Sequence, residues 1–168
     1  WNKCIELGKN FNITPYGTEA MHVLRAEKGY IIVGQETDGS VTPVDLDMNW
    51  IVSKKKYDFI GKRALIRSDT VKEDRKQLVG ILTVDPSIVL EEGSQLVEVE
   101  TSLPMPMVGH ITSSYYSPNL GRSIALALVK SGTKKKGVKL IVPSVNTSVE
   151  VEITNPVFID PKNERLLA

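Results

Sequence analysis

The sequence predicts an α+β fold that is mostly β: a partial α/β subdomain followed by a six-stranded, antiparallel, Greek-key-like barrel. Residues 77–154 contain six short β-rich runs, separated at short intervals by Gly, Pro, Ser and Asn, a spacing typical of an antiparallel barrel or sandwich. Helical signals come earlier, and the highly charged stretch 71–76 separates the two patterns. We therefore expect two domains, residues 1–72 and residues 73–168.

The first domain begins with a helix signal. Thr14 is a good N-cap and Pro15 a good first helical residue, so the helix is expected to run to Glu27. Lys28 and Gly29 form a suitable stop, because a cation favours the negative helix end and glycine accepts the left-handed conformation. The next expected elements are a β-run, a polar loop, a short helix leading into a strand, and another helix, at residues 30–33, 34–43, 47–52 and 61–68.

The second domain carries the barrel strands, expected at residues 77–84, 95–99, 107–114, 123–130, 138–142 and 149–154. The runs 123–130 and 149–154 alternate polar and apolar residues, which predicts strands with one buried and one exposed face.

Composition excludes several classes. The 168 residues carry 21 Lys and Arg against 20 Asp and Glu, a balance that argues against a general nucleic-acid binder. No apolar run approaches the roughly 20 residues of a membrane span, and no signal peptide is visible. One cysteine, Cys4, permits no internal disulfide and suits a reducing, cytoplasmic compartment. Trp1 opens a stretch that reads as an excised domain, the alternative being a processed mature terminus.

Glu27 is the most informative single residue. At helical spacing it shares a face with Ala20, Val23 and Leu24, so a carboxylate continues an apolar stripe. A buried, unpaired charge is costly, so Glu27 needs donors nearby or a ligand that supplies them. The alternative is a last-turn glutamate that leans into solvent.

Other chemistry is sparse. Lys54, Lys55 and Lys56 form a run that either holds an anionic group or makes a solvated turn. Two isolated histidines and one cysteine make a metal site improbable. The sequence also lacks a GxGxxG fingerprint and a P-loop, so no self-contained nucleotide site is expected.

The longer motifs resemble the glycine-cleavage T-protein (aminomethyltransferase) family. The resemblance is carried by Leu24-Arg25-Ala26-Glu27-Lys28-Gly29, by Thr42-Pro43, by Trp50, and by the Phe59-Ile60-Gly61 motif. The later half is similar to the C-terminal barrel of that family, at residues 109–113, 117–121 and 124–127. Within the family, residues 17–22, 33–39 and 156–161 most resemble the branch formed by the alpha subunits of heterotetrameric sarcosine oxidase.

The resemblance implies a tetrahydrofolate-binding module. In that branch, the one-carbon unit released by sarcosine oxidation is captured as 5,10-methylenetetrahydrofolate. Glu27 would correspond to the family glutamate that binds the pterin ring, and Lys54, Lys55 and Lys56 fall where an arginine holds the folate glutamyl tail. The implied partners are folate, the rest of the alpha subunit and the beta, gamma and delta subunits, with no nucleic acid or membrane.

The family's catalytic aspartate precedes this chain, so no catalytic residue is expected here, and the chain alone is predicted to be inactive. FAD, FMN and NAD are implied only for the whole heterotetramer. Two alternatives stay open: a T-protein or dimethylglycine-dehydrogenase-like aminomethyltransferase module, and a non-catalytic folate-binding adaptor like the family members linked to RNA modification or iron–sulfur assembly.

Overall fold

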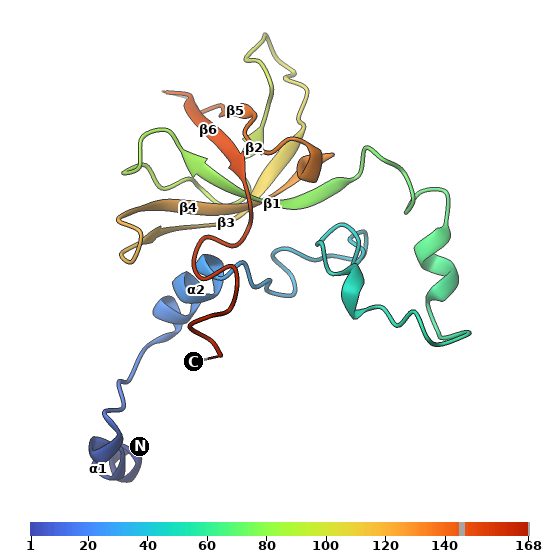
Figure 1. Ribbon diagram of the computed structural model, residues 1–168. Coiled ribbons are helices and arrows are strands. Elements are labelled where there is room, and N and C mark those ends of the chain that lie inside the picture. Colours follow the sequence, from blue (N-terminus) through green and yellow to red (C-terminus); the bar gives the residue numbers. More distant parts are fainter. Residues whose placement is uncertain (145–146, 168) are drawn as a thin grey trace.

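The computed structural model describes residues 1–144 and 147–167, and its main feature is an antiparallel six-stranded barrel (Figure 1). The strands lie in the order β2-β3-β4-β1-β6-β5. A pair of 2.9 Å hydrogen bonds between the backbones of Val97 and Ile141 joins the two edges of the sheet. The strands are β1 (Lys76–Thr83), β2 (Gln95–Leu96), β3 (Gly109–Ser117), β4 (Arg122–Lys130), β5 (Lys139–Val142) and β6 (Val149–Thr154). The predicted fold class and all six predicted strands are therefore confirmed.

The barrel interior is filled by alternate residues of each strand. Val79 and Ile81 of β1 face inward beside Ala125 and Ala127 of β4, and all four are at most 1% exposed. Adjacent strands keep a regular register, Val79 opposite Ala127 and Ile81 opposite Ala125, so these side chains share one face. Because the sheet closes on itself, these apolar side chains are shielded from solvent, and their burial stabilises the barrel.

Strand β4 is buried on both faces, which corrects the prediction of a half-exposed strand. Leu126 and Leu128 point outward, where they join Leu78 and Leu46 in a second apolar cluster. The segment that contains Leu46 covers this outer face, and sequence alternation alone does not show such a cover. In β6 the outward residues Glu150 and Glu152 are exposed, so half-burial was predicted correctly there.

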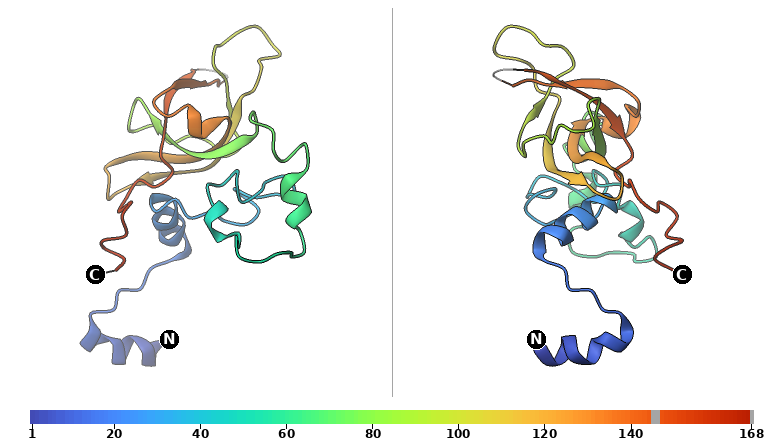
Figure 2. Two further views of the ribbon diagram at one scale, coloured as in Figure 1. Left: turned by 45° about the vertical axis from the view of Figure 1, so that its right-hand side comes forward. Right: turned by 90° about the vertical axis from the view of Figure 1, so that its left-hand side faces the viewer.

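Residues that precede the barrel form short helices and irregular segments. They are α1 (Asn2–Gly8), η1 (Lys9–Phe11), α2 (Thr18–Glu27), η2 (Asn49–Ile51) and η3 (Lys62–Ile66). The end of α2 lies against the barrel, whereas α1 lies well away from it (Figures 1 and 2). Within residues 1–144 and 147–167, none of the helices has the length and apolar character needed to cross a bilayer.

Several local predictions were wrong in detail. Helix α2 begins at Thr18, with Gly17 as an N-cap that makes no side-chain bond, so Thr14 does not cap it. Residues 30–33 form no strand, since their polar atoms bond elsewhere: the Tyr30 carbonyl accepts from Arg25 and the Ile32 N–H donates to Glu36. Residues 61–68 contain the 3₁₀ helix η3, and 47–52 contain η2 with no strand after it.

A partly buried ion pair ties the irregular segment to the start of β1. Arg75 donates to both carboxylate oxygens of Asp45, at 2.9 and 2.6 Å, and the backbone of Thr42 donates at 2.8 Å. Burial works to raise the pKa of Asp45, but these donors outweigh it and hold the pKa below its usual range. The pair fixes the segment that covers the outer face of β1 and β4.

Candidate functional site

Glu27 ends helix α2 with its carboxylate buried against the barrel, only 3% exposed. Ser117, the last residue of β3, donates to Oε1 at 2.5 Å. Asn119, in the turn between β3 and β4, donates from Nδ2 to Oε1 at 3.1 Å and to Oε2 at 2.9 Å. The alternative of a solvent-facing glutamate is therefore wrong, and the expected nearby donors are present.

The buried surface of α2 differs from the predicted stripe. Arg25, Ala26 and Glu27 are buried, whereas Ala20 and Leu24 are exposed, Leu24 by 48%. The buried residues are confined to the last turn of the helix, and His22 one turn earlier packs its ring against Tyr115 of β3, with the ring centroids 6.4 Å apart. Leu24 consequently remains accessible beside the Glu27 carboxylate.

The Glu27 carboxylate keeps spare acceptor capacity. A carboxylate offers about four lone-pair sites, and Ser117 and Asn119 use three of them. No Lys or Arg forms an ion pair with Glu27 among the described residues. One further N–H donor can therefore bind at Oε2 directly, and a second can bind if Asn119 releases one of its two contacts.

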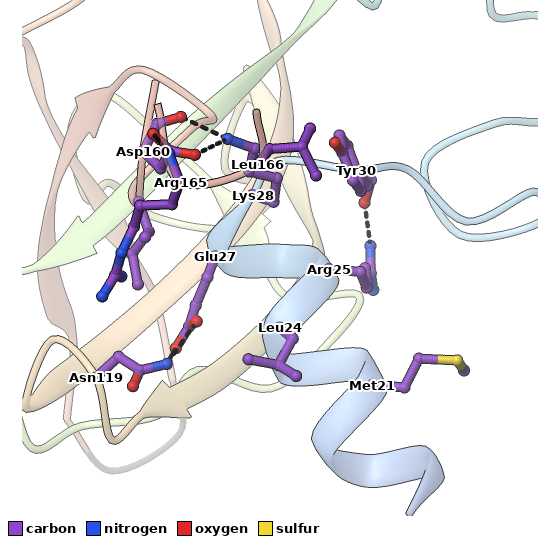
Figure 3. A pocket seen from close by; sticks show the side chains of 11 residues that line it. Met21, Leu24, Arg25, Glu27, Lys28, Tyr30, Asn119, Asp160, Arg165 and Leu166 are labelled. Carbon is purple, nitrogen blue, oxygen red and sulfur yellow. Dashed lines mark hydrogen bonds and ion pairs between the residues drawn. The ribbon is translucent and has the colours of Figure 1, made fainter. Parts of the chain in front are cut away.

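A cavity of about 450 Å³ opens beside this carboxylate (Figure 3). Met21 and Leu24 of α2 line it together with Ile159 and Leu166 from the end of the chain, and Glu27 and Asn119 add polar groups. Apolar walls with a few convergent polar groups are typical of sites for small organic ligands.

A buried network holds α2 in place against the barrel. The Arg25 guanidinium forms an ion pair with Glu36 at 3.0 Å and donates to Ser113 of β3 at 2.6 Å. Glu36 is fully buried and also accepts from Thr112 at 3.0 Å and from Ser113 at 2.5 Å. The sequence did not predict this network, although Arg25 and Glu36 both lie in segments that resemble the T-protein family, residues 24–29 and 33–39. It fixes the last turn of α2 and hence Glu27.

The C-terminal segment 156–167 returns to the same helix end, and we call it the strap. The Phe158 and Ile159 N–H groups donate to the Glu27 carbonyl at 2.9 and 3.0 Å. Lys28 forms an ion pair with Asp160 at 3.1 Å. Gly29 has φ +72°, and a Cβ there would lie 2.6 Å from the Pro156 carbonyl oxygen, so glycine is needed for this close approach.

The lysine run lies elsewhere. Lys54, Lys55 and Lys56 are exposed, and none lines the Glu27 cavity. Lys56 instead borders a separate pocket with Ile51, Val52 and Phe59. The structure therefore does not bring the lysines and Glu27 together. Among residues 1–144 and 147–167, no cluster of three or more His, Cys, Asp or Glu side chains suited to a metal ion is found.

Two family models match the chain. The GCVT N-terminal domain matches residues 1–56, and the glycine cleavage T-protein C-terminal barrel domain matches residues 76–160. The second match covers the barrel, in which the end of β3 and the β3–β4 turn supply the partners of Glu27.

Three curated relatives illustrate the similarity. The sarcosine oxidase alpha subunit of Corynebacterium sp. (strain P-1) is 52% identical over 168 residues, which are 98% of this chain and 17% of that protein. The subunit of the same name from Rhizobium meliloti (strain 1021) is 41% identical over 96% of this chain and 17% of its own length. The aminomethyltransferase of Thermotoga neapolitana is 33% identical over 94% of this chain and 41% of its own length.

A solved structure has the same fold. The crystal structure of the glycine cleavage system aminomethyltransferase T from Bartonella henselae matches with a TM-score of 0.79 at 20% identity. The match covers 94% of this chain and 43% of that one. This chain thus spans about a sixth of the first curated relatives (17%) and less than half of the solved structure.

Proposed function

This chain belongs to the glycine cleavage T-protein (aminomethyltransferase) family, and from that premise we propose that its Glu27 cavity binds the pterin of tetrahydrofolate. The observation that carries the proposal is a buried carboxylate with a free acceptor position at the wall of an apolar cavity. Such a carboxylate suits a ligand that combines a flat, largely apolar body with an edge of N–H donors.

The residues fit this ligand chemically. The aminopyrimidine edge of a pterin carries an exocyclic amine and a ring N–H, and Glu27 can accept from both once Asn119 gives up its contact with Oε2. Met21 and Leu24, exposed by 43% and 48%, supply apolar surface for the ring. Burial beside the ring strengthens the charge-assisted bonds, because water no longer competes for them.

We place this module in an oxidoreductase complex of the sarcosine oxidase type, because 52% identity to such an alpha subunit exceeds the 33% to an aminomethyltransferase. Bound tetrahydrofolate would supply the nitrogen nucleophiles that take up the one-carbon unit as 5,10-methylenetetrahydrofolate. This chain's residues would hold and orient the pterin. The partners would be the rest of the alpha subunit and the beta, gamma and delta subunits, which would carry FAD, FMN and NAD.

Calorimetric titration of the intact protein with tetrahydrofolate tests the role of Glu27. Glu27→Ala removes charge-assisted bonds worth about 1.5–3 kcal/mol each, so we expect affinity to fall by at least ten-fold. Glu19→Ala is the matched control, since Glu19 lies exposed in the first turn of the same helix. Equal affinities for the wild type and Glu27→Ala would contradict the proposal.

The lysine run keeps its proposed role as the site of the glutamyl tail. A lysine attracts a carboxylate as a point charge, so each added tail carboxylate should strengthen the contact. Single changes of Lys54, Lys55 and Lys56 to Gln should therefore weaken polyglutamylated folate more than the monoglutamate. An equal effect on both ligands would exclude tail binding by these residues.

A further inference from the structure

We propose that Arg165, on the strap, recognises the carbonyl oxygen next to the donor edge of the bound pterin, so that the site selects 4-oxo over 4-amino pteridines. The inference rests on the proposed function and adds a specificity residue to it. Arg165 lines the same cavity as Glu27 and Asn119, and Figure 3 shows its side chain on their side of that cavity.

Asp160 directs the strap, and with it Arg165, toward the cavity. Its Oδ2 pairs with Lys28 on α2 at 3.1 Å, and its Oδ1 accepts from the Arg165 backbone N–H at 3.2 Å. Asp160 and Asn163 have φ values of 51° and 61°, which turn the chain sharply between these contacts. Burial favours a higher pKa for Asp160, but the donors outweigh it and hold the pKa below its usual range, so the carboxylate stays charged at neutral pH.

Among the cations that line the cavity in the described part of the chain, Arg165 is the one whose side chain has no partner. Lys28 is paired with Asp160, and Arg25 is paired with Glu36. Among residues 1–144 and 147–167, Arg165 forms no ion pair, and its only hydrogen bond uses its backbone N–H. The cavity therefore presents a carboxylate with spare acceptor capacity and a guanidinium with unused donors.

That combination matches the order of groups along an oxo-pterin. The exocyclic amine and the ring N3–H are donors, and the 4-carbonyl that follows is an acceptor. A carboxylate complements the first two groups, and a guanidinium complements the third with a charge-assisted bond. A 4-amino pteridine places donors where the guanidinium needs an acceptor, so the same arginine disfavours it.

Folic acid and aminopterin are suitable probes, because they differ in the group at position 4 and in the N3–H that only the 4-oxo form carries. The N3 position faces Glu27, which is the same in every Arg165 variant, so a change in the ratio between variants reports on position 4. The measured quantity is the ratio of their Kd values in the intact protein, obtained by calorimetry. Arg165→Gln should shift this ratio about ten-fold toward aminopterin, the size of one lost charge-assisted bond. Arg165→Lys, which keeps the charge, should shift it less, and Lys162→Gln, an exposed strap residue outside the cavity, should leave it unchanged.

The ratio separates recognition from a structural role. A loosened strap would weaken both pteridines alike, so a ratio within two-fold of the wild-type value in Arg165→Gln would overturn the inference. If Glu27→Ala still lowers folate affinity in that case, the proposed function stands and only the role of Arg165 falls. If the wild type binds neither tetrahydrofolate nor the two probes, both proposals fail.

Discussion

Removing the Glu36 carboxylate should destabilise the fold far more than removing an exposed charge. Glu36 is fully buried and accepts four hydrogen bonds: Ile32 N–H at 2.7 Å, Arg25 at 3.0 Å, Thr112 at 3.0 Å and Ser113 at 2.5 Å. In Glu36→Ala the buried Arg25 loses its counter-charge. Breaking one side of a buried pair costs about 3–5 kcal/mol, a large share of the roughly 5–15 kcal/mol that stabilises a domain.

Glu36→Gln should cost less, about 2 kcal/mol, because it keeps the shape and one oxygen. Its amide nitrogen can face Thr112 and Ser113, whose hydroxyls can turn to accept. Thr112 already has a second acceptor, the Leu126 carbonyl at 3.1 Å. The remaining oxygen then faces Arg25 and the Ile32 N–H, so most contacts survive with a neutral acceptor.

Urea-induced unfolding followed by circular dichroism measures these costs as shifts in midpoint at constant slope. Glu92→Ala is the matched control: Glu92 lies in the same neighbourhood, bonded to Tyr115 at 3.3 Å, but it is exposed, and its loss should cost less than about 0.5 kcal/mol. A cost below about 1 kcal/mol for Glu36→Ala, or a larger cost for Gln than for Ala, would refute the reasoning.

Three further changes probe the rest of the structure. The pKa of Asp45 is lower in the folded protein than in the unfolded chain, so its pair with Arg75 stabilises the fold above the unfolded pKa of about 3.9. This stabilisation is lost as the pH falls through the folded pKa. Asp45→Asn should therefore cost about 3 kcal/mol at pH 7, and the free energy of unfolding should then fall less steeply with acidification. Gly29→Ala should lower the melting temperature through left-handed strain of about 1–2 kcal/mol and the clash with Pro156, whereas Gly39→Ala, which has open space, should not; equal melting temperatures would contradict the close approach. Leu140→Ala, in the barrel core, should cost about 2–5 kcal/mol by urea unfolding, and a cost under about 1 kcal/mol would show that the barrel interior is not closely packed.

The barrel was predictable because its signal is local. Each strand is short, its alternation has a period of two residues, and turn residues mark its ends. The strand at 149–154 was predicted with the same bounds that the structure has. The strand expected at residues 30–33 was wrong because β-propensity describes the fit to a sheet surface, and Ile31 finds apolar contacts in the second cluster without any partner strand.

The site was predictable only in outline. Glu27 stood out in the sequence because its carboxylate lies next to apolar residues at the end of a helix. The resemblance of the surrounding motif to the T-protein family then suggested a ligand for this carboxylate. Its partners Ser117 and Asn119 lie 90 and 92 residues further along the chain, and no periodic pattern connects positions so far apart. The bonds from Arg25 to Ser113 and from Lys28 to Asp160 span 88 and 132 residues, and they were not predicted for the same reason.

The sequence by itself determined a mostly β barrel, a helix that stops at Lys28 and Gly29, and membership of the glycine-cleavage T-protein family. Only the tertiary structure decided that the Glu27 carboxylate keeps a free acceptor position, that the lysine run lies outside its cavity, and that the strap brings Arg165 to that cavity. The physical reason is that periodicity and turn chemistry act between neighbouring residues. The partners of a buried charge are set by how a closed barrel brings distant segments together.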